Sequence, residues 1–269
     1  HHVAAGDEVH VLTCTLGEQG EVIPPELAHL DADHEDTLGE FRRDELRGAM
    51  TAIGARSQVL GEDPAVGRLS RWRDSGMAGT PAADDPRCWV RSDDGEAVAA
   101  VRAVVEEVAP DLVVTYDADG GYAHPDHIRT HEISVHAFEA AGDPERYPEL
   151  GEPWQVQKVY YNQDLSPAKW LIIHERMLAD GLESPFGEML ERYRERADTR
   201  RTWLSTRIEC REHFEQRDRA LLAHATQIDP EGGFFTGARE ASKKYWTYEE
   251  FEVALDFTGR DPLDGAQEF

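Results

Sequence analysis

Between residues 9 and 161 the chain repeats one order of segments: a short apolar strand, a polar loop and an amphipathic helix. The predicted strands cover residues 9–15, 57–60, 112–116 and 156–161. The predicted helices between them cover residues 37–53, 95–108 and 125–141. Strands that alternate with helices pair in parallel, because each helix returns the chain to the start of the next strand. This order predicts an α/β, Rossmann-like fold, a mostly parallel sheet with helices on both faces.

The four predicted strands should lie in one sheet, with the first three parallel to one another. Segment 112–116 (L-V-V-T-Y) is an unbroken run, which is typical of a strand covered on both faces. Ligands of such sheets bind beyond the carboxyl ends of the strands. The loops 16–36, 61–93 and 117–127 are polar and follow or lie near strand ends, so functional residues are expected in them.

After residue 162 the pattern changes to charged helices, expected near residues 168–180, 186–197 and 211–226. We interpret residues 163–269 as a C-terminal helical cap that forms part of the cleft. Residues 1–162 are then the α/β core, and the whole chain is one domain.

Charge and cysteine content limit the partners and the compartment of this chain. Lys and Arg total 28 and Asp and Glu total 54, which gives a formal charge of −26. A chain with this much negative charge repels phosphate backbones and anionic lipid surfaces. We therefore expect neither nucleic acid nor a membrane as a partner. The three cysteines, Cys14, Cys88 and Cys210, are far apart and form no C-x-x-C pair. We expect no disulfide framework and no cysteine zinc site, and the pattern fits the cytoplasm.

The chain opens H-H-V-A-A-G-D-E-V, which is typical of the end of a helix, a glycine turn and the start of a strand. This pattern indicates that the sequence begins inside a helix, so we expect a segment before residue 1. A processed N-terminus is the alternative.

The densest group of reactive side chains is G-G-Y-A-H-P-D-H, residues 120–127, directly after the third predicted strand. Tyr122, His124, Asp126 and His127 are crowded there at the carboxyl end of a strand. Imidazole is a zinc ligand and also a general acid near neutral pH. The alternative is an ordinary helix start, with Asp126 as its cap and both histidines bonded to the backbone. A catalytic zinc needs about three protein ligands, so further ligands would have to come from another strand-end loop.

Three other segments carry polar groups whose role the pattern leaves open. Residues 71–77 (R-W-R-D-S-G-M) are suited to the hydroxyls of a polyol, or are a solvated loop. Arg42 and Glu45 lie three positions apart on a predicted helix, where a weak surface ion pair is the simplest interpretation. Residues 224–227 (H-A-T-Q) lie near the end of a predicted helix and either cap it or serve the site.

Four separated motifs, at residues 12–25, 71–77, 115–127 and 224–227, resemble the PIG-L/LmbE-like zinc deacetylases, and more narrowly their mycothiol branch. That branch contains a deacetylase of N-acetylglucosaminyl-inositol and the mycothiol S-conjugate amidase. The first two motifs resemble the deacetylase, whereas the region after residue 160 is closer to the amidase. The family's first motif, A-H-P-D-D-E, is not in this chain, which agrees with an expected segment before residue 1. In the family that motif supplies a His and an Asp as metal ligands and a second Asp as general base.

The resemblance implies roles for the residues that match its third motif. His127 would be the third metal ligand, with the other ligands in the missing N-terminal segment. His124 would stabilise the oxyanion or act as the acid, Asp126 would orient the imidazole of His124, and Tyr122 would also face the oxyanion. The implied metal is Zn²⁺, with Fe²⁺ as an alternative, because a His/Asp/His site accepts both.

Residues outside that motif are implied to hold the substrate. Arg42 and Asp74 would bind sugar and inositol hydroxyls, and Gln227 would support the site from behind. Strand-end loops of a parallel sheet meet at one edge. We therefore expect Arg42, Asp74, Tyr122, His124 and His127 to line one cleft.

The function that follows from the resemblance is metal-dependent hydrolysis of a linear amide. The expected substrate is a small-molecule pseudodisaccharide, 1D-myo-inositol 2-acetamido-2-deoxy-alpha-D-glucopyranoside, which would lose its N-acetyl group in mycothiol biosynthesis. Cleavage of mycothiol S-conjugates is the first alternative. A degenerate, non-catalytic sugar-binding relative is the second.

Overall fold

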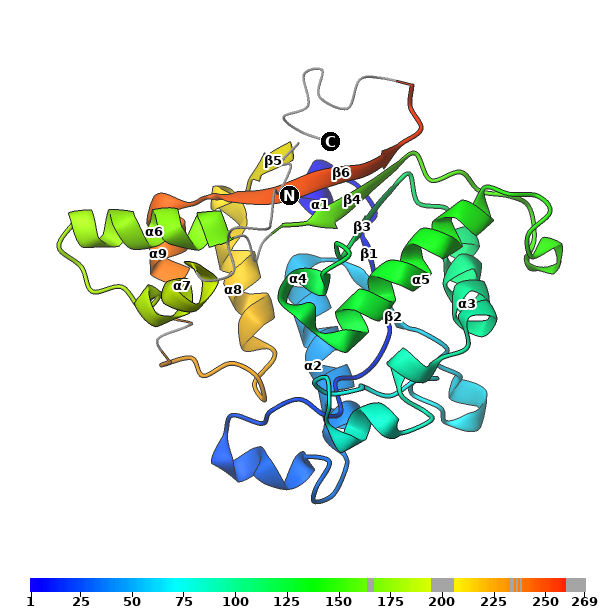
Figure 1. Cartoon of the computed structure of the whole chain (residues 1–269), viewed down its shortest axis with the longest axis horizontal. Coiled ribbons are helices and arrows are strands. Elements are labelled where there is room, and N and C mark those ends of the chain that lie inside the picture. Colours follow the sequence, from blue (N-terminus) through cyan, green and yellow to red (C-terminus); the bar gives the residue numbers. More distant parts are fainter. Residues whose placement is uncertain (164–166, 195–205, 233–234, 236, 238, 260–269) are drawn as a thin grey trace.

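The computed structural model describes residues 1–163, 167–194, 206–232, 235, 237 and 239–259 (Figure 1). Its strands form two sheets. In the smaller sheet β1 (His10–Thr13) pairs in parallel with β2 (Arg56–Val59). In the larger sheet β3 (Leu112–Thr115) pairs in parallel with β4 (Lys158–Asn162). The strands that precede residue 163 are therefore parallel to their partners, as their separation by helices predicts.

The larger sheet is completed by two strands from the C-terminal region, in the order β3-β4-β6-β5. β6 (Tyr248–Asp256) runs antiparallel to β4 on one side and to β5 (Thr206–Glu209) on the other. The residue pattern after residue 162 predicts only helices, so it does not reveal these two strands. The segment F-E-V-A-L-D within β6 alternates apolar and polar residues only in part, which is a weak strand signal.

The prediction that all four strands lie in one sheet is wrong. A ladder needs two backbones about 4.8 Å apart along several residues, and within the described residues no ladder joins β1 to β3. Side chains hold the two sheets together instead, because Leu12 of β1 and Val113 of β3 pack against the same apolar core. Burial of β3 on both faces is also not observed, since Val114 is 44% exposed.

Three helices lie where the apolar periodicity predicts them: α2 (Leu38–Ile53), α3 (Asp94–Val108) and α5 (Pro125–Ala141). Gly54 ends α2 in the left-handed conformation, with φ of 75°, which a glycine adopts without a steric penalty. Asp93 begins α3 by accepting a hydrogen bond from the backbone N–H of Glu96. Local sequence is therefore sufficient to place these three helices.

The remaining helices are shorter or belong to the C-terminal region. The α-helices are α1 (His2–Ala5), α4 (Gly120–Ala123), α6 (Pro167–Ala179), α7 (Gly187–Arg194), α8 (Phe214–Leu222) and α9 (Arg239–Tyr245). The 3-10 helices are Pro25–Leu30, Pro64–Val66, Pro81–Asp84, Trp89–Arg91, Pro148–Leu150 and Arg211–His213. Residues 195–197 of the predicted helix 186–197 lie outside the described residues. The predicted helix 211–226 is a 3-10 turn followed by α8, and it ends earlier than expected.

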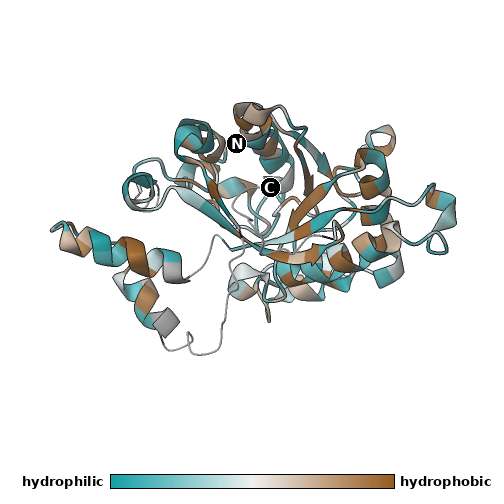
Figure 2. Cartoon of the chain, turned by 90° about the horizontal axis from the view of Figure 1, so that it is seen from above, coloured by the Kyte–Doolittle hydropathy of each residue, from teal (hydrophilic) through white to brown (hydrophobic). Residues whose placement is uncertain are grey.

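Two apolar cores account for the packing. The first lies under α3 and α5 and contains Trp89, Val101, Ile133, Ala137 and Val159, all 4% exposed or less. The second joins α6, α7 and α9 through Ile173, Met177, Leu190 and Ala241. Figure 1 shows α3 and α5 side by side at one end of the molecule and the α6, α7 and α9 group at the other. Figure 2 shows hydrophobic segments on both the strands and the helices, alternating with hydrophilic ones. No helix in the described part of the chain has the length and apolar character to cross a membrane.

Candidate active site

The turn between β3 and α5 is shaped by residues with positive φ. Gly120 and Gly121 have φ of 63° and 73°, and Ala123 has φ of 64°. A Cβ atom on Gly120 would lie 2.9 Å from Cβ of His127 and 2.9 Å from the backbone nitrogen of Ile128. Only glycine allows so close an approach, which brings the turn directly onto the start of α5.

His127 presents a bare ring nitrogen. Its Nδ1 lies 3.1 Å from the carbonyl oxygen of Gly120. A carbonyl oxygen only accepts, so Nδ1–H is the donor and the lone pair of the neutral ring is on Nε2. The ring stacks on Tyr116 with centroids 4.1 Å apart, and burial lowers the pKa of His127. Burial favours a neutral imidazole, which can bind a metal or accept a proton.

His124 presents the opposite tautomer. Its Nδ1 accepts a hydrogen bond from the backbone N–H of Asp126 at 3.2 Å, so His124 is the cap of α5. The neutral ring must then carry its proton on Nε2. The rings of His124 and His127 lie 5.1 Å apart, and Tyr122 lies within 5.8 Å of both. The turn thus displays one imidazole lone pair and one imidazole N–H side by side.

The position of the Asp126 carboxylate corrects the sequence-based interpretation of this residue. The His124 side chain caps the helix, and it is the backbone N–H of Asp126 that contacts the imidazole. The carboxylate is buried, and its Oδ2 accepts from the backbone N–H of Ser75 at 3.1 Å. Burial, with the nearby Asp74 adding to it, raises the pKa of Asp126 to about 7. Asp126 therefore joins the turn at residues 120–127, here called the histidine turn, to loop 71–77.

Asp74 lies at the centre of the site, and its carboxylate also accepts hydrogen bonds from backbone N–H groups. Its Oδ1 accepts from the N–H of Gly76 at 2.8 Å, and its Oδ2 accepts from the N–H of Gln19 at 3.3 Å. Its own N–H donates to Oε2 of Glu18 at 2.9 Å. The carboxylate of Asp74 acts electrostatically on Arg42, Tyr122, Asp126 and His127. The loops after β1, β2 and β3 therefore meet here, as expected of parallel strand ends.

Arg42 reaches the same place from α2. Its Nη1 donates to the carbonyl oxygen of Gly17 at 2.6 Å. A Cβ atom on Gly17 or Gly20 would lie 2.1 or 2.4 Å from that nitrogen, so both glycines leave room for the guanidinium. Asp74 and Tyr122 both lie within electrostatic reach of Arg42. The structure thus brings together Arg42, Asp74, Tyr122, His124, Asp126 and His127.

Gln227 contacts the loop that follows β1. Its Nε2 donates to the carbonyl oxygen of Glu21 rather than to a residue of the histidine turn. Two buried carboxylates of this region, Glu18 and Glu45, are not predicted from the sequence as parts of the site. The sequence predicts Glu45 only as the partner of Arg42 in a surface ion pair, but both of its oxygens accept hydrogen bonds from Thr226. Nothing in the sequence indicates a contact between positions so far apart.

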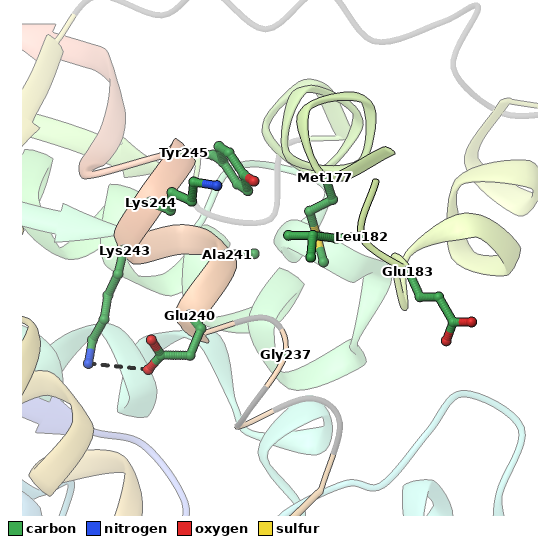
Figure 3. Close-up of a pocket in the computed structure, with 9 residues that line it drawn as sticks. All are labelled: Met177, Leu182, Glu183, Gly237, Glu240, Ala241, Lys243, Lys244 and Tyr245. Carbon is green, nitrogen blue, oxygen red and sulfur yellow. Dashed lines mark ion pairs between the residues drawn. The ribbon is translucent and has the colours of Figure 1, made fainter. Parts of the chain in front are cut away.

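The described residues do not fit a complete metal site. Among them, no three His, Cys, Asp or Glu side chains are grouped so that they could hold a metal ion. A pocket of about 480 Å³ lies elsewhere, between α6 and α9, where Met177, Leu182 and Tyr245 line it (Figure 3). None of the residues of the histidine turn lines that pocket.

Comparison with known proteins gives the family. Residues 1–138, half of the chain, match the family model described as PIG-L: GlcNAc-PI de-N-acetylase. The chain belongs to the PIG-L family. The matched residues include the histidine turn and the loops after β1 and β2 that surround it.

Two curated relatives resemble nearly the whole PIG-L chain. It is 43% identical to the 1D-myo-inositol 2-acetamido-2-deoxy-alpha-D-glucopyranoside deacetylase of Geodermatophilus obscurus, over 87% of this chain and 78% of that protein. It is 40% identical to the mycothiol S-conjugate amidase of Streptomyces coelicolor, over 94% of this chain and 84% of that protein. Among solved structures, GalB, the 4-carboxy-2-hydroxymuconate hydratase of Pseudomonas putida KT2440, has a TM-score of 0.57 at 14% identity, over 97% of this chain and 89% of that one. That likeness shows the fold alone, since a hydratase is named there and a fold hosts many reactions.

Proposed function

We propose that this chain is a deacetylase that hydrolyses the N-acetyl group of 1D-myo-inositol 2-acetamido-2-deoxy-alpha-D-glucopyranoside, in mycothiol biosynthesis. The observation that carries the proposal is the pair of complementary imidazoles, His127 with a bare Nε2 and His124 with a protonated Nε2, 5.1 Å apart. The relative from Geodermatophilus obscurus bears this activity in its name. Belonging to the PIG-L family makes amide hydrolysis the reaction class.

In this reaction water adds to the acetyl carbonyl carbon, the C–N bond breaks, and the amine leaves with a proton. We propose that Nε2–H of His124 donates a hydrogen bond to the oxyanion. The amine takes up the proton that the added water releases, because a neutral imidazole whose Nδ1 accepts from the N–H of Asp126 has no acidic proton to give. Tyr122, which is 48% exposed and tilted against His124, is proposed as a second donor to the oxyanion. Asp126 fixes this geometry by joining loop 71–77 to the start of α5.

The sugar is proposed to lie between Arg42 and Asp74. A guanidinium offers up to five donors and a carboxylate about four acceptor positions, which suits vicinal hydroxyls. Each carboxylate oxygen of Asp74 accepts one backbone N–H, which leaves acceptor capacity on both. The support proposed for Gln227 is indirect, through the loop that it holds at Glu21.

Zn²⁺, with Fe²⁺ as the alternative, stays a prediction of the family resemblance. We propose Nε2 of His127 as one ligand. Since the described residues do not complete a metal site, they account for binding of the sugar and stabilisation of the oxyanion rather than for activation of water. The one-domain organisation and a cytoplasmic location are proposals of the same kind.

The test is turnover of two substrates by one sample of the full chain, followed by release of the free amine. The acetamido pseudodisaccharide should have a kcat/KM at least about tenfold above that of a mycothiol S-conjugate, because the loops meeting at Asp74 carry the binding energy that discriminates them. The opposite order would make the chain an amidase, as named for the Streptomyces coelicolor relative. Binding of the sugar without turnover of either amide would identify a non-catalytic relative.

A further inference from the structure

Glu45 is a buried carboxylate on α2, one turn after Arg42, and the proposed reaction gives it no role. Its Oε1 accepts from the backbone N–H of Thr226 at 2.7 Å, and its Oε2 accepts from the Thr226 hydroxyl at 2.8 Å. Both oxygens therefore face one residue that lies 181 positions away in the sequence. Two hydrogen bonds from one residue to one carboxylate form a two-point anchor.

Thr226 is also hydrogen-bonded to the loop after β1. It is fully buried, and its carbonyl oxygen accepts from the N–H of Ile23 at 2.9 Å. The next residue, Gln227, donates to the carbonyl oxygen of Glu21. Residues 226 and 227 are thus bonded to Glu45 on one side and to residues 21–23 on the other.

The beginning of the same loop is held by the same helix. Arg42 donates to the carbonyl oxygen of Gly17, and the glycines at 17 and 20 close around its guanidinium. Between those points Gln19 donates to Asp74, and Glu18 accepts from it. α2 therefore fixes loop 17–23 at its start directly, and at its end through Thr226.

We propose that Glu45 is a positioning residue: through Thr226 it fixes loop 17–23 against Arg42 and Asp74, and so sets the affinity of the site for its sugar. This inference rests on the proposed function, because it assumes that the sugar binds where loop 17–23 meets Arg42 and Asp74. Glu45 touches neither the histidine turn nor the scissile amide. Its loss should weaken binding of ground state and transition state alike, which raises KM and leaves kcat nearly unchanged.

The first test measures the loop itself by amide hydrogen exchange. Glu45→Met, which removes both acceptors at similar length, should speed exchange of the Ile23 amide at least about tenfold, and Thr226→Val, which deletes only the hydroxyl, should speed it less. Amides of β4 should exchange as in the wild type, since a merely structural loss would speed them too. Glu40→Gln, an exposed carboxylate on the same helix, is the matched control and should change neither.

The second test measures kinetics on the acetamido pseudodisaccharide. KM should rise about tenfold in Glu45→Met with kcat within about threefold, and less in Thr226→Val. Thr226→Ser, which keeps the hydroxyl, should recover the wild-type KM, and Glu45→Gln, which keeps one acceptor, should lie between. If Glu45→Met does not fold, Thr226→Val carries both measurements.

Unchanged Ile23 exchange and unchanged KM in a folded Thr226→Val would overturn the proposal, as would a fall in kcat at constant KM. If the wild type turned over neither amide, the proposed function would fail, and exchange at Ile23 would still decide whether Glu45 positions the loop.

Discussion

At the scale of single residues, the two histidines after β3 should separate in their effects. His127→Ala should lose bound metal in the full chain, because it removes the proposed ligand nitrogen. His124→Ala should keep metal and lose roughly 10²–10³ in kcat, the range for deletion of one donor to the oxyanion. Metal analysis and steady-state kinetics on both variants make the measurement.

His136→Ala is the matched control, since His136 is exposed on the same helix. It should alter neither metal content nor kcat. An empty metal site in His124→Ala together with a full one in His127→Ala would reverse the two assignments. Unchanged metal in both would rule out this turn as a metal-binding element.

Glu18 gives a prediction of pH dependence. Burial raises the pKa of Glu18 above its ordinary value, although the N–H of Asp74 partly opposes this. A carboxyl whose pKa is raised in the folded state stabilises the protein fully at pH values below its unfolded-state pKa. This stabilisation is lost as the pH rises through its folded-state pKa. Glu18→Gln, which keeps an acceptor for Asp74, should therefore lose less free energy of unfolding than the wild type from about pH 4.3 to neutrality. Urea denaturation across that range measures the slope, and equal slopes would contradict the prediction.

At the scale of elements, the turn between β3 and α5 depends on close contact as well as on backbone conformation. Gly120→Ala would place a Cβ atom 2.9 Å from the backbone of Ile128 and from His127. It should lower the free energy of unfolding by about 1–3 kcal/mol and reduce kcat/KM by at least tenfold, because both imidazoles are placed by this turn. Chemical denaturation and steady-state kinetics test the two effects.

Gly67→Ala separates crowding from backbone strain. Gly67 has φ of 69°, close to that of Gly120, but a Cβ atom there would meet nothing within 4 Å. It should cost about 1 kcal/mol and leave kcat/KM unchanged. Equal losses of activity in the two variants would show that the turn is not the element that places the histidines.

At the scale of the whole molecule, the two apolar cores should unfold together. β6 pairs with β4, which belongs to the first core, and follows α9, which belongs to the second. Ile173→Ala in the second core, where the side chain is fully buried, should lower the free energy of unfolding by about 2–5 kcal/mol. Val66→Ala, at a position 71% exposed, should stay within about 0.5 kcal/mol of the wild type.

The measurement is urea unfolding of Ile173→Ala followed by far-ultraviolet and near-ultraviolet circular dichroism. Coincident transitions are expected, because a shared sheet couples the two cores. Two separated transitions would show that the helices after residue 162 unfold as an independent unit.

Residues close together along the chain are enough to predict some features of this fold. The spacing of apolar side chains predicted α2, α3 and α5 to within one residue at each end, and Gly54 predicted the end of α2. The order of strands and loops predicted that polar residues from different loops would meet at strand ends. These features are local because helix periodicity and capping involve residues only three or four positions apart.

Features that depend on the path of the whole chain follow from tertiary packing instead. Packing places β1 and β3 in separate sheets and adds β6 to the larger one. It also decides which nitrogen each histidine presents, because the carbonyl of Gly120 and the N–H of Asp126 select opposite tautomers. The bond between Glu45 and Thr226 spans most of the chain. Whether two distant polar groups meet depends on the packing of every element between them, and no local pattern of residues encodes that distance.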